Sequence, residues 1–192
     1  MSDLPAEAAW RHVGASDGFE VLFPRRADGE WRLVGNSAVI EEGAAWSIHY
    51  DVSVRADWTT RSARVRSVTR RGTAEALLEA DGAGSWLVNG EPAPQLDGLL
   101  DVDLEGSVCT NFMPVRRFGL AAGEFAEAPA AYVRGADLSV ERLDQSYERI
   151  ADASDGGARY RYASPRFGYE AVLSYAPDGL IRDYPDLAAR VA

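Results

Sequence analysis

Alternation of apolar and polar residues over short runs is the feature that most constrains how this chain can fold. The clearest run covers positions 46 to 55, where the residues on the apolar side are Trp46, Ile48, Tyr50, Val52 and Val54. Side chains of a strand point alternately to its two faces, so this period of two predicts a strand with one buried face. Shorter runs with the same period cover 74–79, 158–162 and 169–175.

Turn-forming pairs separate these runs. Asp-Gly, Glu-Gly or Asn-Gly occurs at 28–29, 42–43, 81–82 and 89–90, and such pairs adopt the left-handed backbone of tight hairpin turns. The combination predicts antiparallel β meanders. The expected strands are 19–24, 30–41, 44–55, 58–70, 73–80, 84–89, 99–105, 130–134, 138–151, 158–163 and 169–176. Short helices are expected at 114–118 and 185–191.

Length and hydrophobic content are sufficient for one core. The chain has 192 residues, of which 46% are hydrophobic, and this is within the range of one compact domain. No linker or fixed-period repeat divides it. We therefore predict a single domain over residues 1–192, mainly β, with few short helices.

Charge and terminal sequence bear on partners and location. The formal net charge is −10, and the basic residues are all arginines. A surface of this charge repels nucleic acid and anionic membranes, so we expect neither as a partner. No apolar run is long enough to span a bilayer, and Met1–Trp10 lacks a signal-peptide pattern, which favours a cytoplasmic location. The oligomeric state is left open.

Residue types typical of catalytic and metal sites are sparse. The chain has one cysteine, Cys109, so it cannot form an internal disulfide. Its two histidines, His12 and His49, lack zinc-ligand spacing. No nucleophile elbow, P-loop or dinucleotide motif is present. We therefore expect no cofactor and no metal, and no motif identifies an enzyme.

The segment 97–120, DGLLDVDLEGSVCTNFMPVRRFGL, departs from plain alternation. Asp101 and Asp103 are two residues apart, so on a strand they share a face. In a structural interpretation, one of them forms an ion pair with Arg116 or Arg117. In a functional interpretation, an arginine binds a phosphate or carboxylate head group through a charge-assisted fork. A divalent metal held by both aspartates is disfavoured, because Asp-x-Asp is common by chance and such ions need more oxygen ligands.

Four further polar residues extend this candidate site. Thr110 and Asn111 either form local hydrogen bonds at a turn or bind sugar hydroxyls. Gln145 and Tyr147 share a strand face, so we expect both to point inward, where the glutamine amide needs hydrogen-bond partners.

Trp58 and Arg61 lie at the start of another expected strand. Arg61 shares a face with small residues such as Ala63, which predicts burial beside a partner. The structural expectation is a salt bridge from Arg61 to Asp101 or Asp103.

Aromatic residues fall on several apolar strand faces. Core packing is their first interpretation, and the functional alternative is an aromatic wall around a lipid or sugar cavity. These residues are Trp46, Tyr50, Tyr160, Tyr162, Tyr169 and Tyr175.

The motifs as a set resemble those of a known family, the putative glycolipid-binding proteins. DVDL at 101–104 followed by TNFMPVRRF at 110–118 is similar to that family's DxDL and TNxLPIRR pattern. Further similarities follow in order at 58–61, 84–86, 145–147 and 184–187, so they extend over nearly the whole chain. One departure is Val108, where the family commonly has proline, so the chain is expected to enter the loop before Thr110 differently.

The resemblance implies a long, curved antiparallel sheet that forms a half-open or closed barrel, similar to lipoprotein carriers that hold acyl chains. It also implies a non-enzymatic binding protein for a glycolipid or similar amphipathic small molecule. No residue role is carried over from the family. The candidate ligand-binding residues are those weighed above: Trp58, Arg61, Asp101, Asp103, Thr110, Asn111, Arg116, Arg117, Gln145 and Tyr147.

Two alternatives stay open at this point. One is an enzyme of glycolipid or lipid-linked sugar metabolism, with Asp101 or Asp103 as general base and Arg116 as anion clamp. The other is a scaffold module whose core is filled, with no cavity for a ligand.

Overall fold

The computed structural model describes residues 3–152, 154 and 156–192, and nearly all of its regular structure is β. The first strands are β1 (Ala8–His12), β2 (Ser16–Ala27), β3 (Glu30–Glu41), β4 (Ala44–Val54), β5 (Thr60–Thr69), β6 (Gly72–Ala80), β7 (Trp86–Val88) and β8 (Glu91–Pro92). Then come β9 (Asp101–Leu104) and the helix α1 (Phe112–Phe118). The later strands are β10 (Phe125–Glu127), β11 (Ala130–Val133), β12 (Val140–Leu143), β13 (Ser146–Asp152), β14 (Ala158–Ser164), β15 (Tyr169–Tyr175), β16 (Ile181–Tyr184) and β17 (Ala188–Arg190).

One long antiparallel sheet dominates the fold. Over the described residues it has 14 strands in the order β10-β13-β14-β15-β16-β17-β1-β2-β3-β4-β5-β6-β7-β8. Pairing of β1 with β17 joins the two ends of the chain, with Trp10 opposite Arg190. The outer strands β10 and β8 do not pair with each other, so hydrogen bonds do not close the sheet into a barrel.

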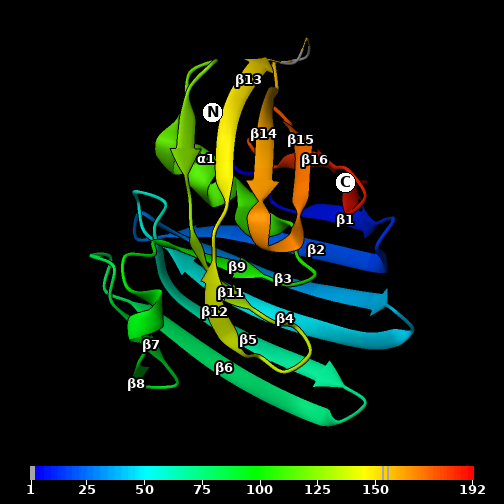
Figure 1. The fold of residues 1–192 in the computed structure, drawn as a ribbon, viewed down its shortest axis with the longest axis vertical. Coiled ribbons are helices and arrows are strands. Elements are labelled where there is room, and N and C mark those ends of the chain that lie inside the picture. The colour runs from blue at the N-terminus through cyan, green and yellow to red at the C-terminus, as the bar shows by residue number, and fades with distance from the viewer. Residues whose placement is uncertain (1–2, 153, 155) are drawn as a thin grey trace.

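The sheet bends strongly along its length. Figure 1 shows β2 to β6 crossing the lower half of the molecule, whereas β13, β14 and β15 stand upright above them. This bend creates a concave side on which other elements can pack.

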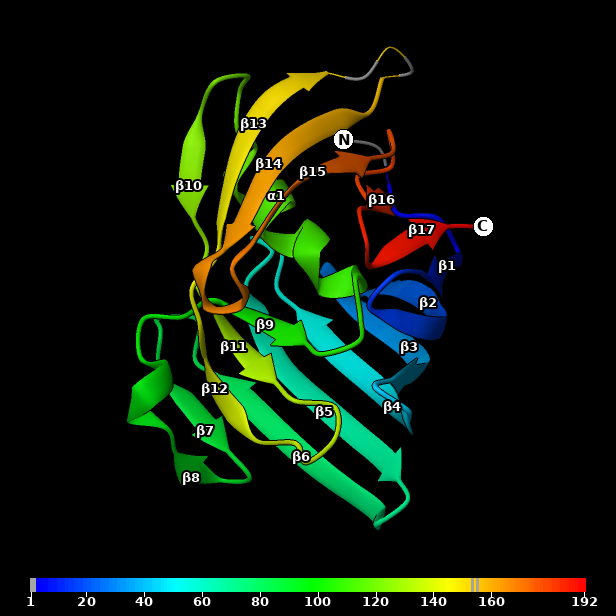
Figure 2. The same cartoon turned by 45° about the vertical axis from the view of Figure 1, so that its right-hand side comes forward.

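A second, small sheet occupies part of that concave side. Its order is β12-β11-β9, with β11 parallel to β9 and antiparallel to β12. Figure 2 shows these strands in front of β3 to β6, with α1 above them. The Ser67 hydroxyl of β5 donates to the Gly135 carbonyl at 2.5 Å, and the Val102 amide of β9 donates to the Thr60 hydroxyl at 3.0 Å. These bonds fix the small sheet to the long one.

The predicted alternation is confirmed in β4. The five residues of its apolar side, from Trp46 to Val54, are all buried, while Ser47, His49 and Asp51 lie on the outer face. The mainly β class and the long, curved antiparallel sheet are likewise observed.

Two expected elements are wrong. The strand expected at 138–151 is two strands, because the chain leaves the small sheet after β12 and enters the long sheet at β13. The helix expected at 185–191 is a turn followed by β17, which pairs with both β16 and β1. In that turn Asp186 has a φ of 60°, a left-handed conformation that ends β16 and lets the chain reverse.

Candidate functional site

A cavity of about 300 Å³ lies between the small sheet and the long sheet. Its volume falls at the lower end of the range of small-molecule pockets. Aromatic rings form much of its wall, contributed by β4, β11, β14, β15 and β16 and by the turn before β15. These residues are Trp46, Tyr132, Tyr162, Phe167, Tyr169 and Tyr184.

Three of the tyrosines form a continuous cluster. The ring centroids of Tyr162, Tyr169 and Tyr184 lie 6.2, 5.7 and 5.8 Å apart in their three pairs. The Tyr162 hydroxyl donates to Gln145 Oε1 at 2.9 Å, and the Tyr169 hydroxyl donates to the Pro185 carbonyl at 2.5 Å. Burial raises the pKa of Tyr169 to about 12, so this phenol is neutral at physiological pH.

Asp103 is the buried acid of the cavity. Its Oδ1 accepts hydrogen bonds from the Thr110 hydroxyl at 2.8 Å and from the Leu104 amide at 2.9 Å. Burial raises the pKa of Asp103 to about 6, although both hydrogen bonds oppose the shift. A carboxyl of this kind changes its charge near neutral pH, which is typical of functional sites but does not by itself define one.

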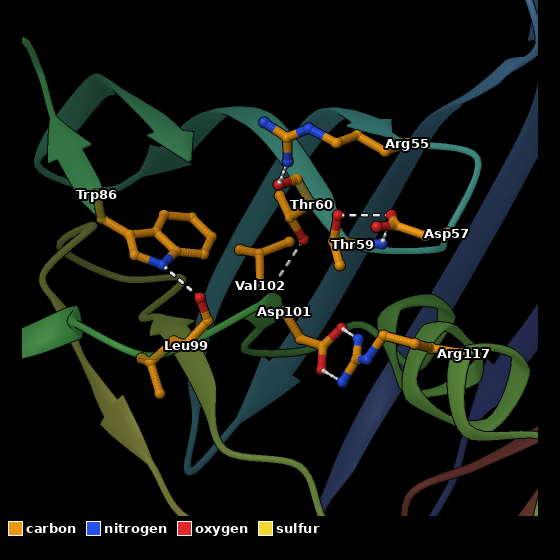
Figure 3. Close-up of polar contacts among 9 residues, drawn as sticks. All are labelled: Arg55, Asp57, Thr59, Thr60, Trp86, Leu99, Asp101, Val102 and Arg117. Carbon is orange, nitrogen blue, oxygen red and sulfur yellow. Dashed lines mark hydrogen bonds and ion pairs between the residues drawn. The ribbon is translucent and has the colours of Figure 1, made fainter. Parts of the chain in front are cut away.

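Asp101 has a different environment, although it lies on the same strand as Asp103. Arg117 holds it in a bidentate ion pair, with Nη2 donating to Oδ2 at 2.6 Å (Figure 3). Burial raises the pKa of Asp101, and the guanidinium of Arg117 opposes that shift. The pair ties α1 to β9 and does not line the cavity, so the structural interpretation holds for these two residues.

Arg116 and Trp58 form a separate group. The guanidinium of Arg116 lies 4.7 Å from the Trp58 ring centroid and donates to the Asp178 carbonyl. Trp58 in turn stacks on Trp31, with ring centroids 6.0 Å apart. Neither Arg116 nor Trp58 lines the cavity, so an anion clamp at Arg116 would lie outside it.

Arg61 corrects an expectation. It is exposed and forms an ion pair with Glu30, with Nε donating to Oε2 at 2.9 Å, rather than with Asp101 or Asp103. The cause is a β-bulge: Ser53 pairs with Ser62 and Val54 with Thr60, so Arg61 is the extra residue. A bulge shifts the alternation of faces by one residue, and the sequence pattern did not reveal it.

Of four predicted polar residues, one lines the cavity and the other three are hydrogen-bonded to residues that line it. Asn111 lines it, and its amide nitrogen donates to the Tyr147 hydroxyl at 2.9 Å. Gln145 supports Tyr162, as described above, and Thr110 supports Asp103. Gln145 and Tyr147 are both buried, as their shared strand face predicted.

The loop that carries Thr110 and Asn111 is fixed by a buried carboxyl that the sequence analysis missed. Glu20 of β2 accepts hydrogen bonds from the Val108 amide at 2.8 Å and from the hydroxyls of Ser107 and Tyr50 at 2.5 and 2.7 Å. Burial raises the pKa of Glu20. The Val108 amide makes this bond, which a proline at the same position could not make.

Further residues that line the cavity carry no distinct signal in the sequence: His12, Glu41, Glu105, Tyr132 and Tyr184. Tyr184 belongs to the segment 184–187 that resembles a family motif, but nothing in the sequence showed that its ring reaches the same cavity as Asp103. His12 is buried, with Ser16 and Ser37 hydroxyls 3.4 Å from its two ring nitrogens, and burial lowers its pKa.

Across residues 3–152, 154 and 156–192, no group of three or more His, Cys, Asp or Glu side chains could hold a metal ion. Cys109 is buried, and burial raises its pKa well above the ordinary value, which disfavours the reactive thiolate.

An open, bent antiparallel sheet around an aromatic cavity defines a class of barrel-like β proteins. Within it, the chain belongs to the family described as Putative glycolipid-binding, whose model matches residues 7–190. The crystal structure of a DUF1089 family protein from Pseudomonas aeruginosa is similar, with 32% sequence identity and a TM-score of 0.77 over 95% of each chain.

A more distant structure shares the fold. A beta-barrel-like protein of the domain of unknown function DUF1849, from Brucella abortus, has 10% identity and a TM-score of 0.51, covering 96% of this chain and 92% of its own. No curated protein matches the chain. In the part of the chain that the structure describes, no helix has the length and apolar character needed to cross a membrane.

Proposed function

We propose that this protein binds a glycolipid or a similar amphipathic small molecule in the cavity between its two sheets. The observation that carries the proposal is the lining itself, in which six aromatic side chains surround a buried carboxyl, Asp103. Aromatic rings bury apolar or sugar-ring surface, while a few polar groups fix orientation. The family description agrees with this kind of ligand.

The size of the cavity limits what it holds. About 300 Å³ accommodates one ring or a short chain, so the rest of a larger amphiphile extends beyond it. Phe167, with 52% of its surface exposed, and Tyr132 lie in edge-to-face contact at 5.8 Å and both line the cavity. They are the residues past which such an extension would run.

Native mass spectrometry of freshly purified protein tests the proposal directly. We expect the spectra to show a bound amphiphile. After its removal, we expect the protein to take up octyl glucoside, and isothermal titration calorimetry measures that affinity. Repeated spectra of unliganded protein, with no uptake from lipid extracts, contradict the proposal.

A cavity-filling variant locates the site. Ser164 is buried and lines the cavity close to Tyr162, so the larger side chain of Ser164→Leu occupies space inside the cavity. We expect it to weaken octyl glucoside binding by about tenfold or more. The matched control is Ser53→Leu, at a partly exposed position of β4 that does not line the cavity, with circular dichroism as the check on folding.

One observation keeps an enzymatic role as a second candidate. Asp103 has a pKa raised to about 6 inside a cavity, as a general base requires. However, the alternative base Asp101 is engaged by Arg117, and Arg116 lies outside the cavity, so Asp103 lacks the expected anion clamp beside it. Recovery of the bound amphiphile chemically unchanged after prolonged incubation favours binding alone, whereas a product that disappears in Asp103→Asn favours catalysis.

A further inference from the structure

The charged lining of the cavity is acidic. Asp103, Glu41 and Glu105 all line it, and no arginine is among its described lining residues. Arg134 lies beside one of these carboxyls, with Nη2 3.6 Å from Glu105 Oε1, and its side chain is 42% exposed. Burial, and next the carboxylates of Glu105 and Glu42, raise the pKa of Glu41. One partly exposed arginine therefore faces three carboxyls.

Other titratable groups near the cavity do not reverse this balance. Arg166 lies beside Phe167 but pairs with Glu141, with Nη2 and Oε1 2.7 Å apart. Burial lowers the pKa of His12, so this imidazole is neutral at physiological pH. An anionic head group would therefore meet carboxylates without a dedicated counter-charge.

The hydrogen-bonding groups of the cavity are biased toward acceptors. Both bonds to Asp103 use Oδ1, so Oδ2 has no hydrogen-bond partner among the described residues. The hydroxyls of Tyr162 and Tyr169 already donate to protein acceptors, so neither offers its proton to a ligand. Ser164 Oγ is also buried and lines the cavity, close to the Tyr162 hydroxyl. A ligand that donates several hydrogen bonds fits this lining.

The aromatic cluster favours a cationic ligand. Tyr162, Tyr169 and Tyr184 lie in mutual ring contact. Asp103 is close enough that its charge contributes, after burial, to raising the pKa of Tyr162 and Tyr184. Neutral aromatic faces attract cations, and cages of such rings beside a carboxylate recognise ammonium groups.

We infer that the amphiphile bound here carries a protonated amine in its head group, held by Asp103 Oδ2 and the tyrosine cluster, and that the cavity discriminates against anionic heads. This rests on the proposed function and names the class of head group that the same cavity selects. It also departs from the arginine-bound phosphate or carboxylate that the segment 97–120 suggested.

The test compares three amphiphiles with the same octyl chain: octylammonium, octyl glucoside and octanoate. Each is titrated into delipidated wild-type protein by calorimetry at about pH 7.5, where Asp103 is ionised. We expect octylammonium to bind about tenfold or more tighter than octyl glucoside, and octanoate to bind most weakly.

The outcomes separate the two proposals. If octyl glucoside or octanoate binds as tightly as octylammonium, the head-group inference is wrong while the binding function stands. If none of the three binds and no amphiphile is recovered from fresh protein, the proposed function fails, and the inference fails with it.

A pair of variants assigns the selectivity to Asp103. Asp103→Asn keeps the acceptor for Thr110 but removes the charge, so we expect octylammonium binding to weaken about tenfold while octyl glucoside binding changes less than about twofold. Asp51→Asn removes a carboxylate paired with Arg32 outside the cavity and should leave both affinities unchanged. Equal losses for amine and glucoside in Asp103→Asn would overturn the assignment.

Discussion

At the scale of single residues, Asp101 and Asp103 show that position on a strand does not decide the role of a carboxyl. Both are buried on β9. Asp101 faces a guanidinium in bidentate contact, whereas Asp103 receives a hydroxyl and an amide. Of the two, only Asp103 lines the cavity, so the proposed head-group selectivity depends on this residue.

Asp103 should make the folded state less stable as pH rises. Its pKa is about 6 in the folded protein against an ordinary value of 3.8, so between these values the folded state binds more protons than the unfolded state. Its contribution to stability is therefore fullest below about pH 4 and is lost as pH rises through about 6. The side chain of Asp103→Asn does not titrate. The unfolding free energy of this variant, relative to that of the wild type, should therefore rise by on the order of 2–3 kcal/mol as pH increases across that range.

Urea unfolding of both proteins at about pH 4 and about pH 7.5 measures that gain. Other titrating groups are common to both proteins and cancel in the difference. A difference that does not change with pH would show that Asp103 is ionised as easily in the folded protein as in the unfolded chain.

Residue-level prediction succeeded where the relevant contact is local and failed where it is made across the fold. The inward direction of Gln145 and Tyr147 follows from strand alternation, and both are buried. The choice of Arg117 rather than Arg116 as partner of Asp101 depends on how α1 is placed against β9. The environment of Arg61 depends on a bulge with no glycine or proline to mark it.

At the scale of elements, the Asp101–Arg117 pair should be a strong link between β9 and α1. Arg117→Ala leaves the buried carboxylate of Asp101 without its counter-charge, so we expect a loss of about 3–5 kcal/mol in unfolding free energy. Arg61→Ala is the matched control, because its partner Glu30 lies on the exposed side of the sheet, and it should change stability little.

Chemical denaturation with a far-ultraviolet circular dichroism signal compares the two arginine variants. Equal, small effects would mean that the ion pair contributes no more than an exposed one. A third variant, Asp101→Asn with Arg117→Met, removes both charges and should recover part of the loss.

Elements with strict alternation were predictable, and elements defined by their partners were not. β4 follows from its own sequence, because every second residue is apolar over its length. β17 is a three-residue strand that exists because β1 and β16 flank it. The chain likewise passes from the small sheet at β12 to the long sheet at β13 because each strand has its partners in a different sheet. Such partners are not visible in the local sequence.

At the scale of the whole molecule, the cavity exists because the small sheet fills only part of the concave side of an open sheet. Trp46 of β4 lies against Gly106 and Gly135, in the loops that follow β9 and β11 of the small sheet, and it also lines the cavity. Gly135 is held by Ser67, which donates to its carbonyl, and its amide donates to Glu105 Oε2 at 2.7 Å. Docking of the small sheet and the shape of the cavity are therefore set by the same contacts.

Gly135→Ala should disturb stability and binding together. A Cβ at Gly135 would lie 2.2 Å from Cζ3 of Trp46, so the indole must move or the small sheet must separate from β4. We expect a loss of about 1–3 kcal/mol in unfolding free energy, weaker octyl glucoside binding and a shift in tryptophan emission. Gly43→Ala, in the turn between β3 and β4, has open space around it and a φ of 78°; it should cost only about 1 kcal/mol from backbone strain and leave binding unchanged. If Gly135→Ala binds as the wild type does, the indole does not shape the site and the small sheet is docked independently of it.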